Sequence, residues 1–256
     1  MTEAPLEILY ADNHLLAVNK PAGLPCQPDA SGDPTLVEAV QTYLKEKYQK
    51  PGNVFVGLVH RLDRPVAGVV VLARTSKAAA RLSAAFREGR IEKVYRAVVV
   101  GCLENEGGRL AHWLRKVSRR RRSEVTGPNA PGARRALLDY RVLETMEGTS
   151  LLEVALLTGR SHQIRVQLAA VGHPILGDLK YGAGAPLSGG AIALYARCLR
   201  FDHPTRDQVV EIVAPDPRGW PWPPGKPARG QDDFSSALRF ETGEDGALQP
   251  KKRSDG

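Results

Sequence analysis

The stretch HRLDR at residues 60–64 places a carboxylate between two guanidinium groups, with Asp63 between Arg61 and Arg64. Two apolar runs enclose it, NVFVGLV before and VVVLAR after, which the sequence predicts to be buried strands. A carboxylate flanked by cations stays ionised, and an ionised carboxylate can act as a nucleophile or a base. On residue type alone, an ion pair that only holds a loop is the simpler interpretation, because such pairs commonly lack a catalytic role.

A second group of polar residues lies in LLTGRSHQIRVQLAAVGHPILGDLKYG, residues 156–182. Arg160 follows a glycine, Ser161 is in position to cap a helix, and Arg165 comes one turn later. A helix N-terminus with arginines suits a phosphate or carboxylate partner. We therefore expect this block to bind an anion and to begin a helix that ends near Gly172.

Several common chemistries lack their sequence motifs. There is no GxGxxG after a strand, no GxxxxGKS/T, no HExxH and no GxSxG, so dinucleotide, nucleoside triphosphate, zinc protease and common esterase sites lack their main support. His162 and His173 have no third ligand beside them, which favours structural histidines over a metal site. The widely spaced Cys26, Cys102 and Cys198 indicate reduced thiols. We expect neither a metal nor a cofactor.

The positive charge is concentrated in one segment. The chain has 256 residues and a net charge of +8, which favours a polyanionic partner. Between residues 109 and 135 only Glu124 is negative, and nine residues are positive: Arg109, Arg115, Lys116, Arg119, Arg120, Arg121, Arg122, Arg134 and Arg135. The first residues contain no long apolar run, so we expect no signal peptide, no membrane span and a cytoplasmic setting.

A framework of strands and helices must position these residues. Strands are predicted in EILY, LLAVNK, GVVVLAR, KVYRAVVVG, ALLDYRVLET, SLLEVALLTG, IALYARCLRF and QVVEIVAP. A helix is predicted to begin at Pro34 with Asp33 as its cap and to contain the apolar positions from Leu36 to Tyr48, and another in SKAAARLSAAFR with Thr75 or Ser76 as its cap. Neighbouring strands join through short turns, which predicts an α+β fold with a mixed, largely antiparallel central sheet and flanking helices.

Two segments depart from this framework. Residues 103–136 carry the arginines together with much Gly and Pro, so we expect a structureless basic flap or insertion there. Residues 216–256 have few apolar residues and much Pro, Gly and charge, so we expect a disordered tail. The remaining chain, within residues 1–215, is expected to form one domain, and the protein is expected to be a monomer.

Three blocks in order, HRLDRPVAGVVVLART, IEKVYRAVV and LLTGRSHQIRVQLAAVGHPILGDLKYG, resemble the signature blocks of the RluA-type RNA pseudouridine synthases. The opening ILYADNHLLAVNKPAGLPCQP is similar to the N-terminal strand pair and KPAG loop of that family, and YARCLRFDHP to its C-terminal block. The resemblance implies the pseudouridine synthase fold and isomerisation of a uridine in ribosomal or transfer RNA, without a cofactor. The S4-like RNA-binding module that precedes this domain in many relatives is not expected, because the strand pair begins within the first ten residues.

The resemblance also implies roles for four residues. Asp63 matches the essential aspartate that isomerises uridine, a reaction that breaks the N-glycosidic bond and rejoins the base to the ribose through carbon 5. Tyr95 matches a tyrosine that packs on the target base and is a candidate for proton removal. Arg165 matches the basic residue that pairs with the aspartate. Arg61 matches the arginine that enters the RNA stack in place of the flipped base.

The other arginines are expected to bind RNA phosphates. A basic flap could hold phosphates on either side of the target, although a solvated run of charges is equally consistent with the sequence. The residues are Arg64, Arg160, Arg119, Arg120, Arg121 and Arg122.

The sequence departs from the family pattern at two places. Val66 and Ala67 stand where relatives usually have Thr and Ser, and Gln167 stands where His is common. The loss of two hydroxyls removes hydrogen-bonding groups near the loop. It is the only support for a rival hypothesis, a non-catalytic RNA-binding or RNA-folding protein. A third hypothesis is a hydrolase that uses Asp63 to release free uracil.

Overall fold

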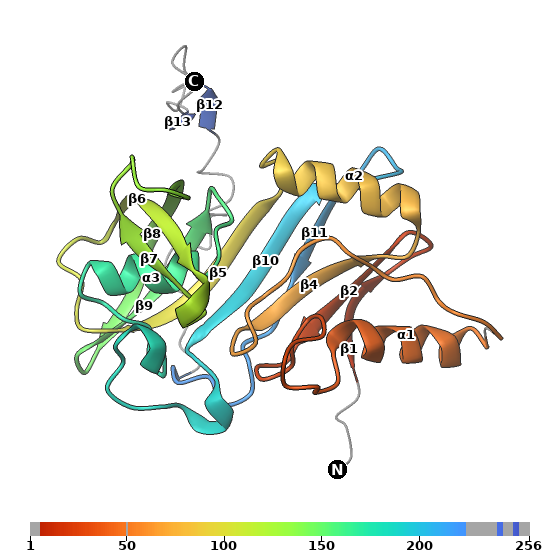
Figure 1. Cartoon of the computed structure of the whole chain (residues 1–256), viewed down its shortest axis with the longest axis horizontal. Coiled ribbons are helices and arrows are strands. Elements are labelled where there is room, and N and C mark those ends of the chain that lie inside the picture. The colour runs from red at the N-terminus through yellow and green to blue at the C-terminus, as the bar shows by residue number, and fades with distance from the viewer. Residues whose placement is uncertain (1–5, 50, 224–239, 243–247, 251–256) are drawn as a thin grey trace. The chain divides into compact units, whose positions relative to one another are not determined.

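The computed structural model describes residues 6–49, 51–223, 240–242 and 248–250 (Figure 1). The chain divides into two compact units, and the division in the sequence falls between Trp222 and Pro223. In the second unit, the described residues form two short antiparallel strands, β12 (Phe240–Thr242) and β13 (Leu248–Pro250). All other elements belong to the first unit.

Eleven strands of the described residues form one sheet in the first unit, with the order β1-β2-β4-β10-β5-β9-β8-β6-β7 and with β11 on β10 and β3 on β4. Their bounds are β1 (Glu7–Ala11), β2 (Leu15–Lys20), β3 (Gly57–Leu58), β4 (Ala67–Ala73), β5 (Glu92–Val100), β6 (Gly107–Val117), β7 (Arg122–Thr126), β8 (Arg134–Met146), β9 (Thr149–Leu156), β10 (Leu194–Asp202) and β11 (Val209–Val213). The pairs are antiparallel except β4 with β10. The predicted mixed, largely antiparallel α+β fold is confirmed.

Two helices cover opposite faces of the sheet near its N-terminal strands. Helix α1 (Leu36–Lys47) packs in a core with Leu16 of β2, whereas α2 (Ser76–Arg87) packs in a second core with Leu15 of the same strand. Successive residues of a strand point to opposite faces, so the two helices lie on different sides. This explains why every residue of β4 is buried.

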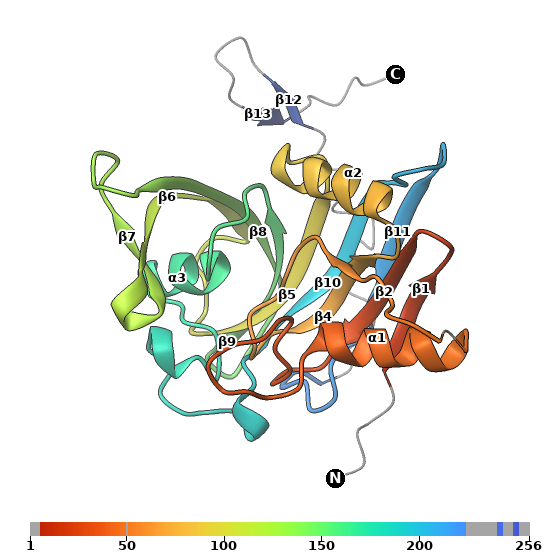
Figure 2. The same cartoon turned by 45° about the vertical axis from the view of Figure 1, so that its right-hand side comes forward.

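A third helix lies inside the curved half of the sheet. Figure 2 shows α3 (Gln163–Ala170) enclosed by β6, β7, β8 and β9, and its Val166 packs with Leu114 and Ala136 of the surrounding strands. Because the sheet curls around it, the first turn of α3 faces the loop that precedes β4. Three short 3₁₀ turns complete the unit, at Ser118–Arg120, Leu179–Tyr181 and Ser188–Gly190.

The helix caps differ in part from those predicted. Thr75 caps α2 as expected. Helix α1 is capped by Thr35, which forms a capping box with Glu38, and not by Asp33. Asp33 instead accepts a hydrogen bond from Arg64 at 2.5 Å. The predicted cap was wrong because Thr35 and Glu38 satisfy free amides at both positions of the box, whereas Asp33 has a cationic partner distant in sequence.

The cap predicted for α3 was also wrong. Ser161 does not cap the helix; its carbonyl accepts a hydrogen bond from the Ser123 hydroxyl at 2.6 Å. The capping position belongs to His162, whose backbone is left-handed with φ 55° and whose side chain makes no capping bond. The partner that withdraws Ser161 comes from β7, which local sequence could not indicate.

The segment predicted as a structureless flap is ordered. Residues 103–136 contain all of β6, the turn at Ser118–Arg120, β7 and the start of β8, so the prediction was wrong. Strand β6 buries Leu114 against α3 while the residues around it are charged or exposed. β6 needs few apolar residues, because only one of its faces packs against α3. The alternation of apolar and polar residues that is typical of a strand was therefore hidden by the charged residues. The basic residues therefore lie on β6, β7 and β8 and on the turn that joins β6 to β7; β6, this turn and β7 together are called the basic hairpin.

The first unit extends beyond the predicted domain end at residue 215. Trp222 is buried and its Nε1 donates to Glu144 Oε2 at 2.9 Å, and Trp220 packs edge-on against Tyr195 with ring centroids 4.8 Å apart. Asp216 adds polar contacts with the sheet, because it accepts a hydrogen bond from the Tyr195 hydroxyl and lies 3.6 Å from Arg96 Nη1. Much of the predicted disordered tail, at 224–239, 243–247 and 251–256, lies outside the described residues. Among the residues described, no helix has the length and apolar composition required to cross a membrane.

Candidate active site

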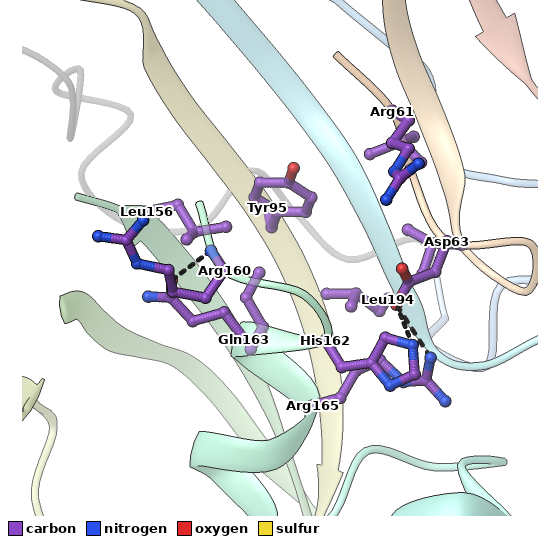
Figure 3. A pocket seen from close by; sticks show the side chains of 12 residues that line it. Arg61, Asp63, Tyr95, Leu156, Arg160, His162, Gln163, Arg165 and Leu194 are labelled. Carbon is purple, nitrogen blue, oxygen red and sulfur yellow. Dashed lines mark hydrogen bonds and ion pairs between the residues drawn. The ribbon is translucent and has the colours of Figure 1, made fainter. Parts of the chain in front are cut away.

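A pocket opens where the loop before β4, strand β5 and the start of α3 meet (Figure 3). Apolar side chains from these elements and from β9 and β10 form part of its wall: Leu62, Val66, Leu156, Ile164 and Leu194. The polar residues predicted from three separate blocks of sequence also line it: Arg61, Asp63, Tyr95, Arg160 and Arg165. The fold thus brings together residues that are up to about a hundred positions apart.

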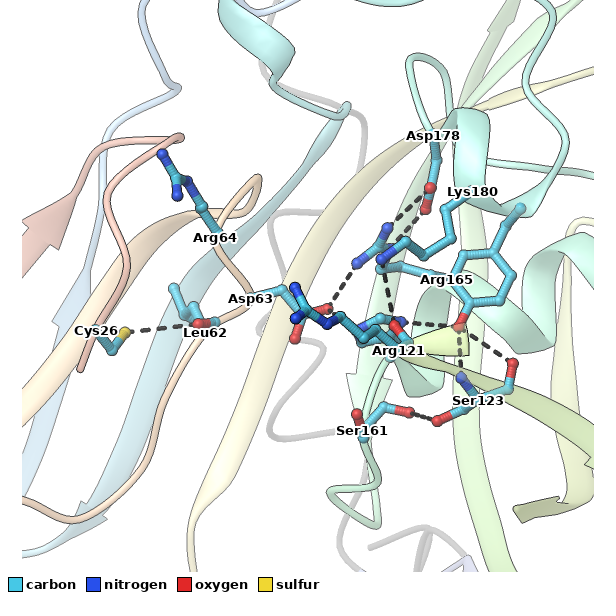
Figure 4. A network of polar contacts seen from close by, with 12 residues as sticks. Cys26, Leu62, Asp63, Arg64, Arg121, Ser123, Ser161, Arg165, Asp178 and Lys180 are labelled. Atoms are coloured by element: carbon cyan, nitrogen blue, oxygen red, sulfur yellow. Dashed lines mark hydrogen bonds and ion pairs between the residues drawn. The ribbon is translucent and has the colours of Figure 1, made fainter. Parts of the chain in front are cut away.

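Asp63 and Arg165 form the central contact of the pocket (Figure 4). The Nη1 atom of Arg165 donates to Asp63 Oδ2 at 2.9 Å. The other side of the guanidinium donates from Nε and Nη2 to Asp178, at 2.6 and 2.9 Å. The exposed fraction of the side chains is 30% for Asp63, 5% for Arg165 and 1% for Asp178, so the series runs from the protein interior to the pocket.

This chain of charges fixes the direction of the Asp63 carboxylate. Burial opposes the charge of Arg165, but the hydrogen bonds and charges of Asp178 and Asp63 outweigh burial and raise the pKa of Arg165 above its usual value. A planar guanidinium bound on two sides cannot rotate freely. One oxygen of Asp63 is therefore held by Arg165, and the carboxylate is presented to the pocket.

The loop that carries Asp63 is held by an unusually close approach of two strands. Gly68 has φ +111°, and a Cβ atom placed there would lie 2.2 Å from the Ala196 carbonyl oxygen. Ala67 and Gly68 pair with Tyr195 and Ala196 as the parallel part of the sheet. Only glycine fits this position, which places the preceding loop against β10.

A buried lysine binds the backbone of the loop that carries Asp63. Lys20 is 0% exposed, and its Nζ donates to the carbonyls of Pro21, Leu24 and Arg64 at 2.9, 2.8 and 3.3 Å. Burial is the main cause that lowers its pKa to about 8. Lys20 thereby joins the first loop of the chain to the residue that follows Asp63.

Tyr95 stands on β5, across the pocket from Asp63 (Figure 3). Burial, followed by the charges of Asp63 and Cys26, raises the pKa of the phenol above its usual value. The ring is therefore a neutral aromatic surface at ordinary pH. Such a surface is suited to stacking on a planar base.

His162 approaches the same oxygen of Asp63 that Arg165 contacts. Its Nε2 lies 3.7 Å from Asp63 Oδ2, and its Nδ1 lies 2.8 Å from the Tyr181 hydroxyl. That hydroxyl also contacts the backbone of Ser123 in β7, with the Ser123 amide donating at 2.9 Å. Lys180 adds a bond from Nζ to the carbonyl of Arg121 at 3.2 Å (Figure 4). These contacts connect the basic hairpin to the pocket.

The arginines predicted to bind RNA divide into two groups. Arg61 is exposed and lines the pocket, and Arg160 lines it too while its Nε donates to the Arg135 carbonyl at 3.0 Å. Arg64 is exposed and paired with Asp33. The backbone of residues 119–122 lies on the hairpin, and among the described side chains Arg119, Arg121 and Arg122 do not line the pocket. Of these, Arg119 and Arg121 are exposed.

The comparisons identify the family. The model of RNA pseudouridylate synthases matches residues 14–170. A Zymomonas mobilis protein named ribosomal large subunit pseudouridine synthase D is 35% identical over 226 residues, which cover 84% of this chain and 71% of that protein. A protein of the same name from Xylella fastidiosa is 38% identical over 84% of this chain and 67% of its own length. The chain belongs to the RNA pseudouridylate synthase family.

Solved structures of this family have the same fold. The structure of human RNA pseudouridylate synthase domain containing 4 matches with a TM-score of 0.72 and 26% identity, over 84% of this chain and 90% of that one. Human RNA pseudouridylate synthase domain containing 1 matches with a TM-score of 0.66 and 29% identity, over 82% and 83%. The resemblance drawn from the sequence blocks is confirmed, and the chain is an isomerase of this pseudouridylate synthase family.

The two departures from the family pattern occupy buried positions in this synthase. Val66 and Ala67 are 3% and 5% exposed. Gln167 is 0% exposed, and its Nε2 donates to the carbonyls of Leu110 and Ala136 at 3.1 and 3.3 Å. Gln167 therefore links α3 to β6 and β8. None of the three residues presents a side chain on the outer surface.

Sequence reasoning missed three polar partners of the residues that line the synthase pocket, and of these only His162 lines the pocket itself. His162 was interpreted as structural, and Asp178 and Tyr181 were not singled out. All three lie in the same sequence block as Arg165. An acidic residue that follows a basic pocket residue within one block was the available signal for Asp178. No local signal could identify the Tyr181 contact, because it depends on the turn at Leu179–Tyr181 folding back onto α3 and β7.

Proposed function

We propose that this protein converts a specific uridine of structured RNA to pseudouridine, with Asp63 as the essential carboxylate. The observation that carries the proposal is the contact between Asp63 and Arg165 inside a pocket that also contains an aromatic wall. Membership of the pseudouridylate synthase family supports it. The reaction consumes no water and changes no oxidation state, so the proposal requires no cofactor.

The target base must leave the RNA stack before Asp63 can reach it. Flipping a base costs a few kcal/mol, and a filler for the vacated place lowers that cost. Arg61 is exposed at the pocket and its planar guanidinium can stack on the neighbouring bases. Arg61 is therefore the proposed filler.

Within the pocket, Tyr95 and Asp63 act on the same nucleotide. The neutral ring of Tyr95 supports one face of the uracil. The carboxylate of Asp63 attacks the anomeric carbon, adds to the ring, or removes a ribose proton, and each route begins with the ionised form. Arg165 positions that carboxylate and balances the charge that changes during the reaction.

The basic hairpin supplies affinity for the RNA backbone. Arg119 and Arg121 are exposed there. Arg160 lines the pocket and also donates to the Arg135 carbonyl of β8, the strand that pairs with β6. Contacts from arginines to phosphates are independent of sequence and weaken with salt. They position the RNA, and the pocket selects the uridine.

Large-subunit ribosomal RNA is the proposed target, because the curated relatives bear the name ribosomal large subunit pseudouridine synthase D. A cytoplasmic setting is part of the same proposal. The test is to map pseudouridine in ribosomal and transfer RNA of cells with and without the gene, and after complementation with wild type or Asp63→Asn. We expect a site in large-subunit ribosomal RNA to disappear on deletion and to return only with wild type. Loss of no site, or full restoration by Asp63→Asn, would overturn the proposal.

A further inference from the structure

His162 is placed to act on the substrate together with Asp63. It lines the pocket, its side chain is 14% exposed, and its Nε2 lies 3.7 Å from Asp63 Oδ2. The left-handed backbone at His162, immediately before α3, directs the imidazole into this position. A nucleobase that lies in contact with the Asp63 carboxylate therefore also lies close to His162 Nε2.

The contacts on the far side of the ring allow a tautomer in which Nδ1 carries the proton. Nδ1 of His162 lies 2.8 Å from the Tyr181 hydroxyl. That hydroxyl accepts from the Ser123 amide at 2.9 Å and lies 3.2 Å from the Ser123 carbonyl, to which it can donate its single proton. When the phenol proton points to the Ser123 carbonyl, Nδ1 of His162 is the donor to Tyr181. In that tautomer of the neutral ring, Nε2 has a free lone pair on the pocket side.

The surroundings keep the imidazole neutral. Burial is the largest cause that lowers the pKa of His162, and the cations Arg165 and Lys180 lower it further. The carboxylates of Asp63 and Asp178 oppose this, but the pKa still lies below its usual value. The neutral form, which can accept a proton, therefore predominates at neutral pH.

Tyr95 is less suited to accept a proton, because the phenol must first become a phenolate. Burial and the charge of Asp63 raise the pKa of that phenol. The pocket thus contains one aromatic residue that is held neutral and protonated, and one imidazole that is held neutral with a free lone pair. These properties assign stacking to the first and proton transfer to the second.

We propose that His162 removes the proton from carbon 5 of the uracil ring after carbon 5 has bonded to the ribose; this inference rests on the proposed function. The C–H bond at carbon 5 breaks and its electron pair forms the C5–C6 double bond. The electron pair of the N1–C6 double bond returns to N1, which takes a proton from water. The proton on Nε2 then passes to water, so no net proton is gained or lost. While His162 is protonated, the adjacent Asp63 carboxylate stabilises its charge.

The first test uses His162→Asn. Asparagine tolerates the left-handed backbone of this position, so the start of α3 is preserved. Ribosomal RNA is transcribed with ordinary uridine or with uridine carrying deuterium at carbon 5, and kcat for pseudouridine formation is measured. We expect kcat to fall about 10²- to 10⁴-fold and the remaining reaction to become slower with the deuterated RNA. His173→Asn, at a half-buried histidine whose Nδ1 lies 2.9 Å from the Val100 carbonyl oxygen and which does not line the pocket, is the matched control and should match wild type.

The second test uses His162→Gly with free imidazole. Glycine also adopts the left-handed backbone and leaves space at the pocket. We expect added imidazole to restore part of kcat in His162→Gly but not in Asp63→Asn. An unchanged kcat in His162→Asn, or a fall in kcat without an isotope effect and without rescue by imidazole, overturns the inference. If wild type forms no pseudouridine in this RNA, the proposed function has failed instead.

Discussion

Arg165 lies between two carboxylates and donates to both, to Asp63 through Nη1 at 2.9 Å and to Asp178 through Nε at 2.6 Å. Asp178 is almost fully buried, whereas Asp63 is partly open to the pocket. A buried carboxylate is costly without its partner. One residue therefore has two separable effects, on the stability of the fold through Asp178 and on the reaction through Asp63.

Replacing Arg165 should affect both stability and activity. We expect Arg165→Met to lower the free energy of unfolding by about 3–5 kcal/mol, because it leaves the Asp178 charge buried and unpaired. The double variant with Asp178→Asn should regain much of that stability but none of the activity, because Asp63 still lacks its guanidinium. Urea unfolding and initial rates on RNA measure the two effects. Recovery of activity in the double variant would contradict the role given to Arg165.

Gly68 should be irreplaceable. In Gly68→Ala the new methyl group meets the Ala196 carbonyl and the backbone is held at φ +111°, so we expect a loss of about 2–6 kcal/mol in the free energy of unfolding. Gly89→Ala is the matched control, because Gly89 also has positive φ, +73°, but has nothing within 4 Å of the added Cβ. It should lose only about 1–2 kcal/mol. Equal losses in the two variants would show that the close approach of β4 and β10 is unimportant.

His60 should make the fold sensitive to acid. Its Nε2 accepts a hydrogen bond from the Val71 amide at 2.9 Å and its ring stacks on Phe86. Burial, with a smaller effect of Lys93, lowers its pKa from 6.5 to about 3. Between pH 6.5 and about pH 3, His60 is protonated in the unfolded chain but neutral in the folded chain. The free energy of unfolding therefore falls as the pH falls through this range.

The measurement is urea unfolding of wild type and His60→Gln between pH 7 and pH 4. Because His60 binds a single proton, its contribution is at most about 1.4 kcal/mol per pH unit, and its partial exposure reduces this. We expect the wild type to lose stability more steeply than the variant over this range. Parallel curves would show that the neutral form of His60 is not required.

The exposed arginines of the hairpin should determine the salt dependence of RNA binding. We expect Arg119→Gln to weaken RNA binding and to reduce the slope of log affinity against log salt by about 1, with kcat unchanged. Arg87→Gln, on the exposed surface of α2, removes the same charge away from the hairpin and serves as the control. Fluorescence anisotropy of labelled RNA at several salt concentrations checks this. Identical slopes for the two variants would indicate that the hairpin charges are only solvated.

The sequence predicted those parts of the molecule whose signals are local. The apolar run that follows HRLDR and the run KVYRAVVVG are rich in branched apolar residues, and both were confirmed as strands, β4 and β5. The run that precedes HRLDR, NVFVGLV, was predicted to be a buried strand, and this was wrong for most of its length: only Gly57–Leu58 form a strand, β3, and Phe55 is 50% exposed. The ordered blocks also brought Asp63, Tyr95 and Arg165 into one hypothesis. What failed depends on distant partners. The basic segment was interpreted as a flap because β6 obtains its apolar environment from α3, and Ser161 lost its capping role to a contact with Ser123.

The central claim is that the Asp63 carboxylate performs the isomerisation, and purified protein tests it most directly. Wild type and Asp63→Asn, which keeps the shape of the side chain but removes its charge, are incubated with large-subunit ribosomal RNA, and pseudouridine is counted in the product. We predict that wild type forms pseudouridine, whereas Asp63→Asn binds the same RNA and forms none. Pseudouridine formation by Asp63→Asn at the wild-type rate would contradict the account.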